Sequence, residues 1–190
     1  MEVYIDDVVV KSKDLKAHLA DLEQALQRMR VHNLKMNPAK CMFGVSAGNF
    51  LGFLVHQKGI EIDQNKAKAV MEARPPRNKK ELQSLLGKIN FLRRFIANSA
   101  GKMKAFSPLL KLKNANEMVW GPEQQEAFEQ IKKALASPPV LVPPTPGKPL
   151  KLYIAAAEES IGCLLAQDVV DGTERAVYYL SRSLNDAETR

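Results

Sequence analysis

The sequence predicts an α+β fold, because short strand-forming runs lie near both ends of the chain and helical patterns fill the middle. The first strand-forming run, 3–10, is apolar apart from Tyr4 and two adjacent acids. Apolar runs near the other end have strand composition, at 150–154, 161–165 and 176–180. A stretch with six prolines, 138–149, precedes them and marks the clearest internal boundary.

The middle of the chain predicts helices with recognisable starts. Three residues have the character of N-caps: Ser12, Asp63 and Asn78, the last with Glu81 as a capping box. Apolar spacings of three and four then predict helices over 12–30, 63–71 and 78–96, with the apolar stripe of the first in a core. Further helices are expected around 103–110 and from Pro122 to Ser137, and short strands at 41–43, 50–55 and 60–62.

Composition excludes several classes of protein. With 45% hydrophobic and 26% charged residues, the 190-residue chain has an ordinary globular composition. Cys41 and Cys163 are far apart and have no ligand spacing, which argues against a zinc site or a disulfide framework and fits a reduced intracellular setting, cytoplasmic or nuclear. No apolar run approaches the about 18 residues of a membrane span, so no membrane partner is expected.

Positive charge is concentrated in one part of the chain. The net charge is +7, yet ten basic residues and a single acid, Glu81, lie between Arg77 and Lys113. This cluster alone exceeds the charge of the whole chain, and one-signed enrichment costs self-repulsion unless a polyanion is bound. We therefore expect contact with a phosphate backbone, the alternative being a solvated helix face.

Asp6 and Asp7 interrupt the first apolar run, and adjacent acids favour a tight turn over a strand interior. The run therefore predicts a β-hairpin with both carboxylates at its tip. Carboxylates this close repel each other unless a cation lies beside them, and oxygen ligands suit Mg²⁺. The alternative is a polar turn without chemistry.

In this order, the segments resemble the polymerase polyprotein of gypsy-class long-terminal-repeat retrotransposons over essentially the whole chain. The stretch 4–7, Tyr-Ile-Asp-Asp, is similar to the metal-binding hairpin of reverse transcriptase, and 34–41 to the next palm motif. The stretch 50–53 is similar to the primer grip and consists of Phe50, Leu51, Gly52 and Phe53. The stretch 86–96 resembles the thumb, and 120–132 resembles the lead into RNase H.

This resemblance implies a partial palm of β-hairpins plus a helix, a helical thumb and the first strands of an RNase H-like mixed sheet. It implies four parts: the C-terminal part of the palm at 1–74, a basic thumb at 75–116, a connection helix with a Pro-rich linker at 117–147, and the N-terminal part of an RNase H-like domain at 148–190.

The resemblance also implies a function, that of a fragment of an RNA-directed DNA polymerase. In the full-length enzyme Asp6 and Asp7 would be catalytic ligands of Mg²⁺, and the partners would be an RNA/DNA template–primer duplex and the rest of the polyprotein. The residues expected to contact nucleic acid are Lys79, Lys80, Lys88, Arg93, Arg94, Lys102 and Lys104.

Two departures from the family leave enzymatic activity open. The family's third palm carboxylate and the fingers would precede Met1, and the later RNase H acids would follow residue 190. The chain therefore looks cut at both ends and is expected to be inactive alone. The position of the first RNase H carboxylate falls on Ala155, which cannot ligate a metal, and Glu188 falls at the position of the second. Glu158 and Glu159 are possible substitutes for the missing first carboxylate, but they are expected in a turn. The alternative function is a non-catalytic nucleic-acid-binding remnant.

Overall fold

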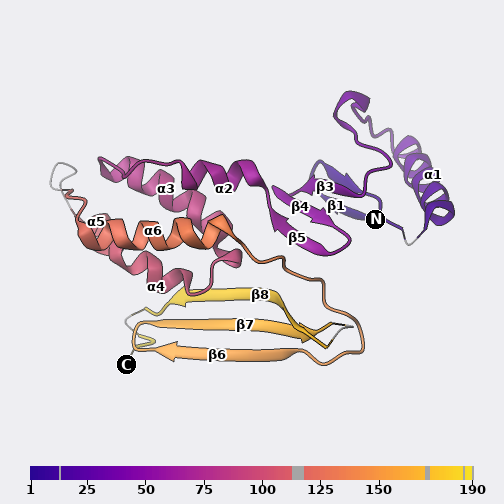
Figure 1. The fold of residues 1–190 in the computed structure, drawn as a ribbon. Coiled ribbons are helices and arrows are strands. Elements are labelled where there is room, and N and C mark those ends of the chain that lie inside the picture. Colours follow the sequence, from indigo (N-terminus) through magenta and orange to yellow (C-terminus); the bar gives the residue numbers. More distant parts are fainter. Residues whose placement is uncertain (13, 113–117, 170–171, 186, 190) are drawn as a thin grey trace. The chain divides into compact units, whose positions relative to one another are not determined.

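The computed structural model describes residues 1–12, 14–112, 118–169, 172–185 and 187–189. They form two compact units, Met1–Gln57 and Lys58–Arg190 (Figure 1). Both units combine helices with antiparallel strands, which confirms the α+β class. Within the described ranges, no helix has the length and apolar content that crossing a membrane requires.

The first unit holds two β-hairpins and one long helix. Its elements are β1 (Glu2–Tyr4), β2 (Asp7–Val9), α1 (Leu15–Val31), η1 (Pro38–Lys40), β3 (Ala47–Phe50) and β4 (Phe53–His56). β1 pairs antiparallel with β2, and β3 pairs antiparallel with β4. The strand predicted at 41–43 is wrong. These residues follow η1, where the backbone N–H of Cys41 already bonds the carbonyl of Pro38 at 3.1 Å.

Helix α1 differs from its prediction at its start and on its apolar face. Its N-cap is Asp14 and not Ser12, because the Asp14 carboxylate accepts the N–H of Ala17 at 2.8 Å. The apolar stripe is not core in this structure. Leu15 is 73% exposed and Leu19 60%, and the only buried residue of α1 is Ala25.

The second unit begins with β5 (Gly59–Ile62), which forms a bridge between Ile60 and Leu141. Gly59 is required there, since it has φ +142° and a Cβ would collide with the Leu141 carbonyl. Helices follow: α2 (Gln64–Met71), α3 (Lys79–Leu92), η2 (Arg93–Phe95), α4 (Ser99–Met103), η3 (Lys104–Phe106), α5 (Ser107–Lys111) and α6 (Pro122–Ala136).

The predicted caps of these helices are present. Asp63 accepts the N–H of Asn65 at 2.8 Å, and Asn78 accepts the N–H of Glu81 at 2.9 Å. The helix predicted over 78–96 is shorter, because it tightens to a 3₁₀ turn after Leu92. The helix predicted around 103–110 is broken into α4, η3 and α5.

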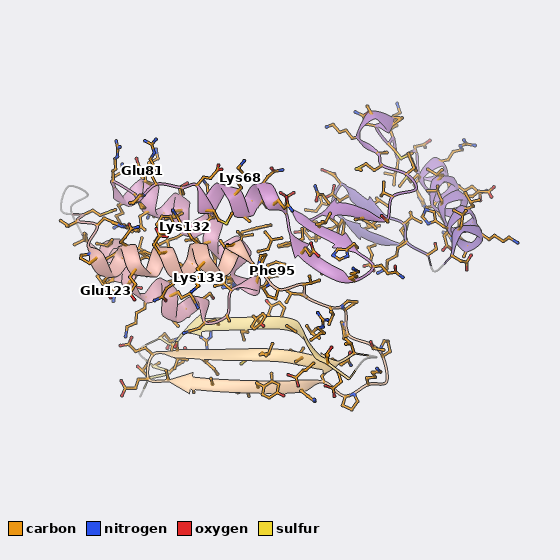
Figure 2. All side chains as sticks on the ribbon, in the orientation of Figure 1. Lys68, Glu81, Phe95, Glu123, Lys132 and Lys133 are labelled. Carbon is orange, nitrogen blue, oxygen red and sulfur yellow. The ribbon has the colours of Figure 1, made fainter. Side chains whose placement is uncertain are left out.

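The core of the second unit lies between these helices. Its fully buried large side chains are Val70, Leu82, Ile89, Leu92, Phe95, Ile96, Phe106, Phe128, Ile131 and Leu135. Trp120 closes one end of this core, with its ring 5.5 Å from Phe106 and 5.9 Å from Phe128. Figure 2 shows Phe95 on the side of the helices that faces the last strand.

The last three strands form an antiparallel sheet in the order β6 (Lys151–Ala157), β7 (Ser160–Asp168), β8 (Glu174–Ser183). β8 is the strand next to the helices: the N–H of Ala100 in α4 donates to the buried Ser181 hydroxyl at 2.9 Å. The proline-rich stretch is fixed to the same sheet, since the N–H of Val142 donates to the Ala176 carbonyl at 2.9 Å.

Candidate functional site

The β1–β2 hairpin carries the two adjacent acids. Tyr4 pairs with Asp7 and Val3 with Val8, which leaves Ile5 and Asp6 as the two-residue loop. The prediction of both carboxylates at the tip therefore needs one correction. Asp6 lies in the turn, whereas Asp7 is the first residue of β2, opposite Tyr4.

This hairpin is open to solvent. Ile5 is 80% exposed and Tyr4 54%, and Asp6 and Asp7 are also exposed. A divalent cation could reach both carboxylates. Among the residues that the structure describes, however, no three His, Cys, Asp or Glu side chains gather into a group that could hold a metal. Asp6 and Asp7 thus fit Mg²⁺ as part of a ligand set, not as a whole one.

The predicted primer-grip residues form the turn of the β3–β4 hairpin. Phe50 pairs with Phe53, and Leu51 and Gly52 make the loop with φ values of 53° and 76°. Positive φ at both positions is the geometry of a type I′ turn, which matches the twist of the flanking strands. The continuous strand predicted over 50–55 is therefore wrong, and Phe53 is buried while Leu51 is 39% exposed.

Four of the seven cations predicted to contact nucleic acid are engaged within the chain. The Lys79 ammonium donates to the Leu112 carbonyl at 3.0 Å, and the Lys102 ammonium donates to the Ala97 carbonyl at 2.6 Å. Lys104 pairs with Glu159 at 2.6 Å. Arg94 lies over the ring of Tyr178, 5.7 Å from its centroid. Partial burial lowers the pKa of Lys102, and the contact with Glu159 raises that of Lys104.

The other three cations, Lys80, Lys88 and Arg93, are exposed. Within the described part of the chain, no hydrogen bond or ion pair engages their side chains. Lys80 and Lys88 lie two turns apart on α3, and Arg93 follows in η2. The structure thus separates free cations from structural ones, which charge counting along the sequence could not do.

The predicted RNase H residues lie at or near one end of the β6–β7–β8 sheet. Ala155 pairs with Gly162 in the interior of the β6–β7 hairpin, and Glu158 with Glu159 forms its two-residue loop. Glu188 is bound by Arg182, whose two terminal nitrogens donate to its carboxylate at 2.8 and 2.9 Å. This partner could not be predicted from the sequence, because a strand residue and a turn residue six positions apart have no regular spacing.

Two family models match the chain at its two ends. Residues 1–55 match the model described as reverse transcriptase (RNA-dependent DNA polymerase). Residues 120–190 match the RNase H-like domain found in reverse transcriptase. The chain therefore joins a segment similar to reverse transcriptase to a segment similar to an RNase H-like domain. The two segments occur in the order that the resemblance implied.

Retrotransposon polyproteins are similar to this chain along nearly its whole length. The Transposon Tf2-3 polyprotein of Schizosaccharomyces pombe is 34% identical over 185 residues, or 97% of the chain, and the Transposon Tf2-7 polyprotein is 33% identical over the same share. The chain spans only 14% of the length of either polyprotein.

Solved structures share the fold. A foamy viral protease-reverse transcriptase in complex with an RNA/DNA hybrid matches with a TM-score of 0.84 and 24% identity, over 100% of this chain and 25% of that one. The same enzyme in complex with dsDNA matches with a TM-score of 0.79 and 23% identity, over 95% of this chain and 37% of that one. At this identity the likeness concerns the fold alone.

Proposed function

We propose that this chain is the template–primer-contacting part of a gypsy-class retrotransposon RNA-directed DNA polymerase. Its parts would be the C-terminal palm at 1–74, the thumb at 75–116, the connection at 117–147 and the start of the RNase H-like domain at 148–190. The observation that carries the proposal is that one chain has exposed adjacent acids at a hairpin, Asp6 and Asp7, and also exposed cations on α3 and η2 that no contact within the described residues engages. The fold shared with a nucleic-acid-bound enzyme supports it.

In this proposal Asp6 and Asp7 supply two of the carboxylates that hold Mg²⁺. When bound, the metal would activate the primer oxygen and neutralise the incoming triphosphate. The exposed hairpin presents both carboxylates without an ion-pair partner among the described side chains that would compete for them. The turn formed by Phe50, Leu51, Gly52 and Phe53 would support the primer backbone.

Lys80, Lys88 and Arg93 are proposed to contact phosphates. Lys88 comes eight positions after Lys80, so the two residues lie about 12 Å apart along the helix axis. This is the axial rise of about three to four nucleotides of one strand. Lys79, Arg94, Lys102 and Lys104 contribute less in this proposal, because each would have to give up a contact within the chain.

Fluorescence anisotropy with an RNA/DNA duplex tests the phosphate contacts. Replacing Lys80, Lys88 and Arg93 with Gln is expected to weaken binding and to reduce the slope of log K against log salt by about 2 to 3, since each lost phosphate contact removes about 0.9.

The matched control replaces three other exposed cations of the second unit with Gln: Lys133, Lys148 and Arg175. This control removes the same charge outside α3 and η2, and it is expected to leave the slope of log K against log salt nearly unchanged. Equal losses in both variants would contradict a specific contact surface on α3 and η2 and would indicate attraction by net charge alone.

Primer extension separates the polymerase proposal from a non-catalytic nucleic-acid-binding remnant. The isolated chain is expected to show no extension with Mg²⁺, because two carboxylates alone bind the metal weakly. In a polymerase completed with upstream palm and fingers, Asp6→Asn is expected to abolish extension while duplex binding persists. Unchanged primer extension by the Asp6→Asn variant would favour the alternative, a non-catalytic nucleic-acid-binding remnant.

A further inference from the structure

One end of the β6–β7–β8 sheet gathers acidic side chains. Glu158 and Glu159 form the loop between β6 and β7. The chain returns to this loop after β8, because the N–H of Leu184 donates to the Glu159 carbonyl at 2.8 Å. Glu188 follows four residues later. A metal centre at this end of the sheet would have to draw on these carboxylates.

The donor set does not fit a divalent cation. RNase H-like domains generally use divalent metals, and the resemblance assigns the first carboxylate to position 155, where β6 has an alanine. A methyl group cannot ligate a metal. None of the described His, Cys, Asp and Glu residues here combine into a group of three that could hold an ion. The residue types at this end of the sheet therefore do not match the metal site that the resemblance implies.

The chain supplies its own cations to this cluster. Lys104 of η3 pairs with Glu159 at 2.6 Å. Arg182 of β8 holds Glu188 through two parallel bonds, a geometry that is among the strongest for a carboxylate. The backbone N–H of Asn185 adds a third bond to Glu188 at 3.0 Å. These partners lower the pKa values of Glu159 and Glu188, so both carboxylates stay charged and paired with a cation of the chain.

The geometry points to a metal-independent clasp at this end of the sheet, in which Arg182 and Lys104 supply the positive charge that a divalent cation supplies in metal-dependent relatives. Lys104 comes from the helices and Glu159 from the sheet, so their pair also ties the RNase H-like sheet to the helical region. The buried bond from Ala100 to Ser181 reinforces this attachment. The RNase H-like segment then acts as a structural extension of the helices and not as a nuclease.

Metal titration tests the clasp in the full chain. Asp6→Asn and Asp7→Asn are introduced first, so that the β1–β2 hairpin cannot contribute binding. Mn²⁺ is then added while NMR line broadening is followed. In this background we expect no Mn²⁺ binding with Kd below about 1 mM at Arg182, Glu188 or Glu159. Tighter binding that disappears on Glu188→Gln would overturn the proposal.

A charge swap tests the attachment independently of metal. Lys104→Glu places two acids together and is expected to lower the Tm by about 2 °C or more, whereas Lys104→Glu with Glu159→Lys is expected to restore it. The control is Lys68→Glu with Glu72→Lys, which exchanges a similarly exposed pair at 3.6 Å. Because this pair lies within α2 and joins no two elements, its exchange should leave the Tm unchanged. No loss from Lys104→Glu, or a loss that the swap does not restore, would exclude a clasp.

Discussion

Ile5 adopts a backbone conformation that its side chain disfavours. Its φ is 52°, and a β-branched residue in the left-handed region is strained. Because Ile5 is also 80% exposed, it gains little from burial. Ile5→Asn is expected to stabilise the β1–β2 hairpin by about 1 kcal/mol, since Asn tolerates this region. Amide hydrogen exchange across β1 and β2 should slow about fivefold.

The control for this substitution is Val8→Asn, which introduces the same side chain into a strand position of negative φ. It is expected to speed exchange, because Asn is a poor strand residue. Equal effects at positions 5 and 8 would show that the side chain's polarity, and not the positive φ, determines hairpin stability. The strain itself is consistent with a functional turn, where unusual backbone geometry is often retained.

Some residue roles followed from the sequence and others did not. Asp63 and Asn78 were predicted as caps because each precedes a clear apolar period, and both accept backbone N–H groups as expected. The prediction of Ser12 as the cap of α1 is wrong, because Ser12 and Asp14 are both good capping residues and lie within one turn of each other. Only the structure shows that the Asp14 carboxylate meets the N–H of Ala17.

At the scale of elements, Gln167 fastens the proline-rich stretch to β7. This side chain is 2% exposed. Its oxygen accepts the N–H of Thr145 at 2.6 Å, and its nitrogen donates to the carbonyls of Thr145 and Lys148 at 3.1 and 2.9 Å. Gln167→Leu is expected to cost about 1 to 3 kcal/mol, because it removes the three hydrogen bonds that this buried amide makes with the proline-rich stretch. A urea titration measures the loss.

The exposed Gln83 of α3 provides the comparison, since Gln83→Leu removes an amide of the same size from solvent. It should shift the urea midpoint little. An equally small shift for Gln167→Leu would show that the proline-rich stretch stays in place without this side chain. The role of Gln167 could not be predicted, because its partners lie about twenty positions away in a segment that looked like a free linker.

Turns were harder to predict than strands or helices. The run 50–55 is apolar throughout, so its composition predicted one strand. The turn at Leu51 and Gly52 could not be predicted, because Leu is an unusual residue at positive φ. In contrast, the three strands at the end of the chain were all predicted, since their apolar runs are bounded by acidic or glycine-containing turns.

At the scale of the whole molecule, the clasp predicts acid sensitivity. The pKa values of Glu159 and Glu188 lie below their usual 4.5 in the folded chain, chiefly through hydrogen bonds from Lys104 and Arg182. Their contribution is therefore present above the unfolded pKa and is lost as pH falls through the lowered folded value. Urea midpoints across an acid titration should decline there, and Glu159→Gln with Glu188→Gln should flatten that decline. An unchanged profile would contradict the prediction.

The two compact units are expected to differ in independent stability. The fully buried large side chains, from Val70 to Leu135, all belong to Lys58–Arg190. In Met1–Gln57 the buried apolar residues among those described are Ala25 and Phe53 alone, and isolated two-stranded hairpins are marginal in water.

Residues 58–190 expressed alone are therefore expected to unfold cooperatively by circular dichroism, with a Tm close to that of the full chain. Residues 1–57 alone are expected to show no cooperative transition, because too little apolar surface is buried to offset the entropy of ordering them. A cooperative transition in 1–57 would mean that α1 and the two hairpins form a core of their own. The hairpin that carries Asp6 and Asp7 would then be preformed and would not depend on further chain to order it.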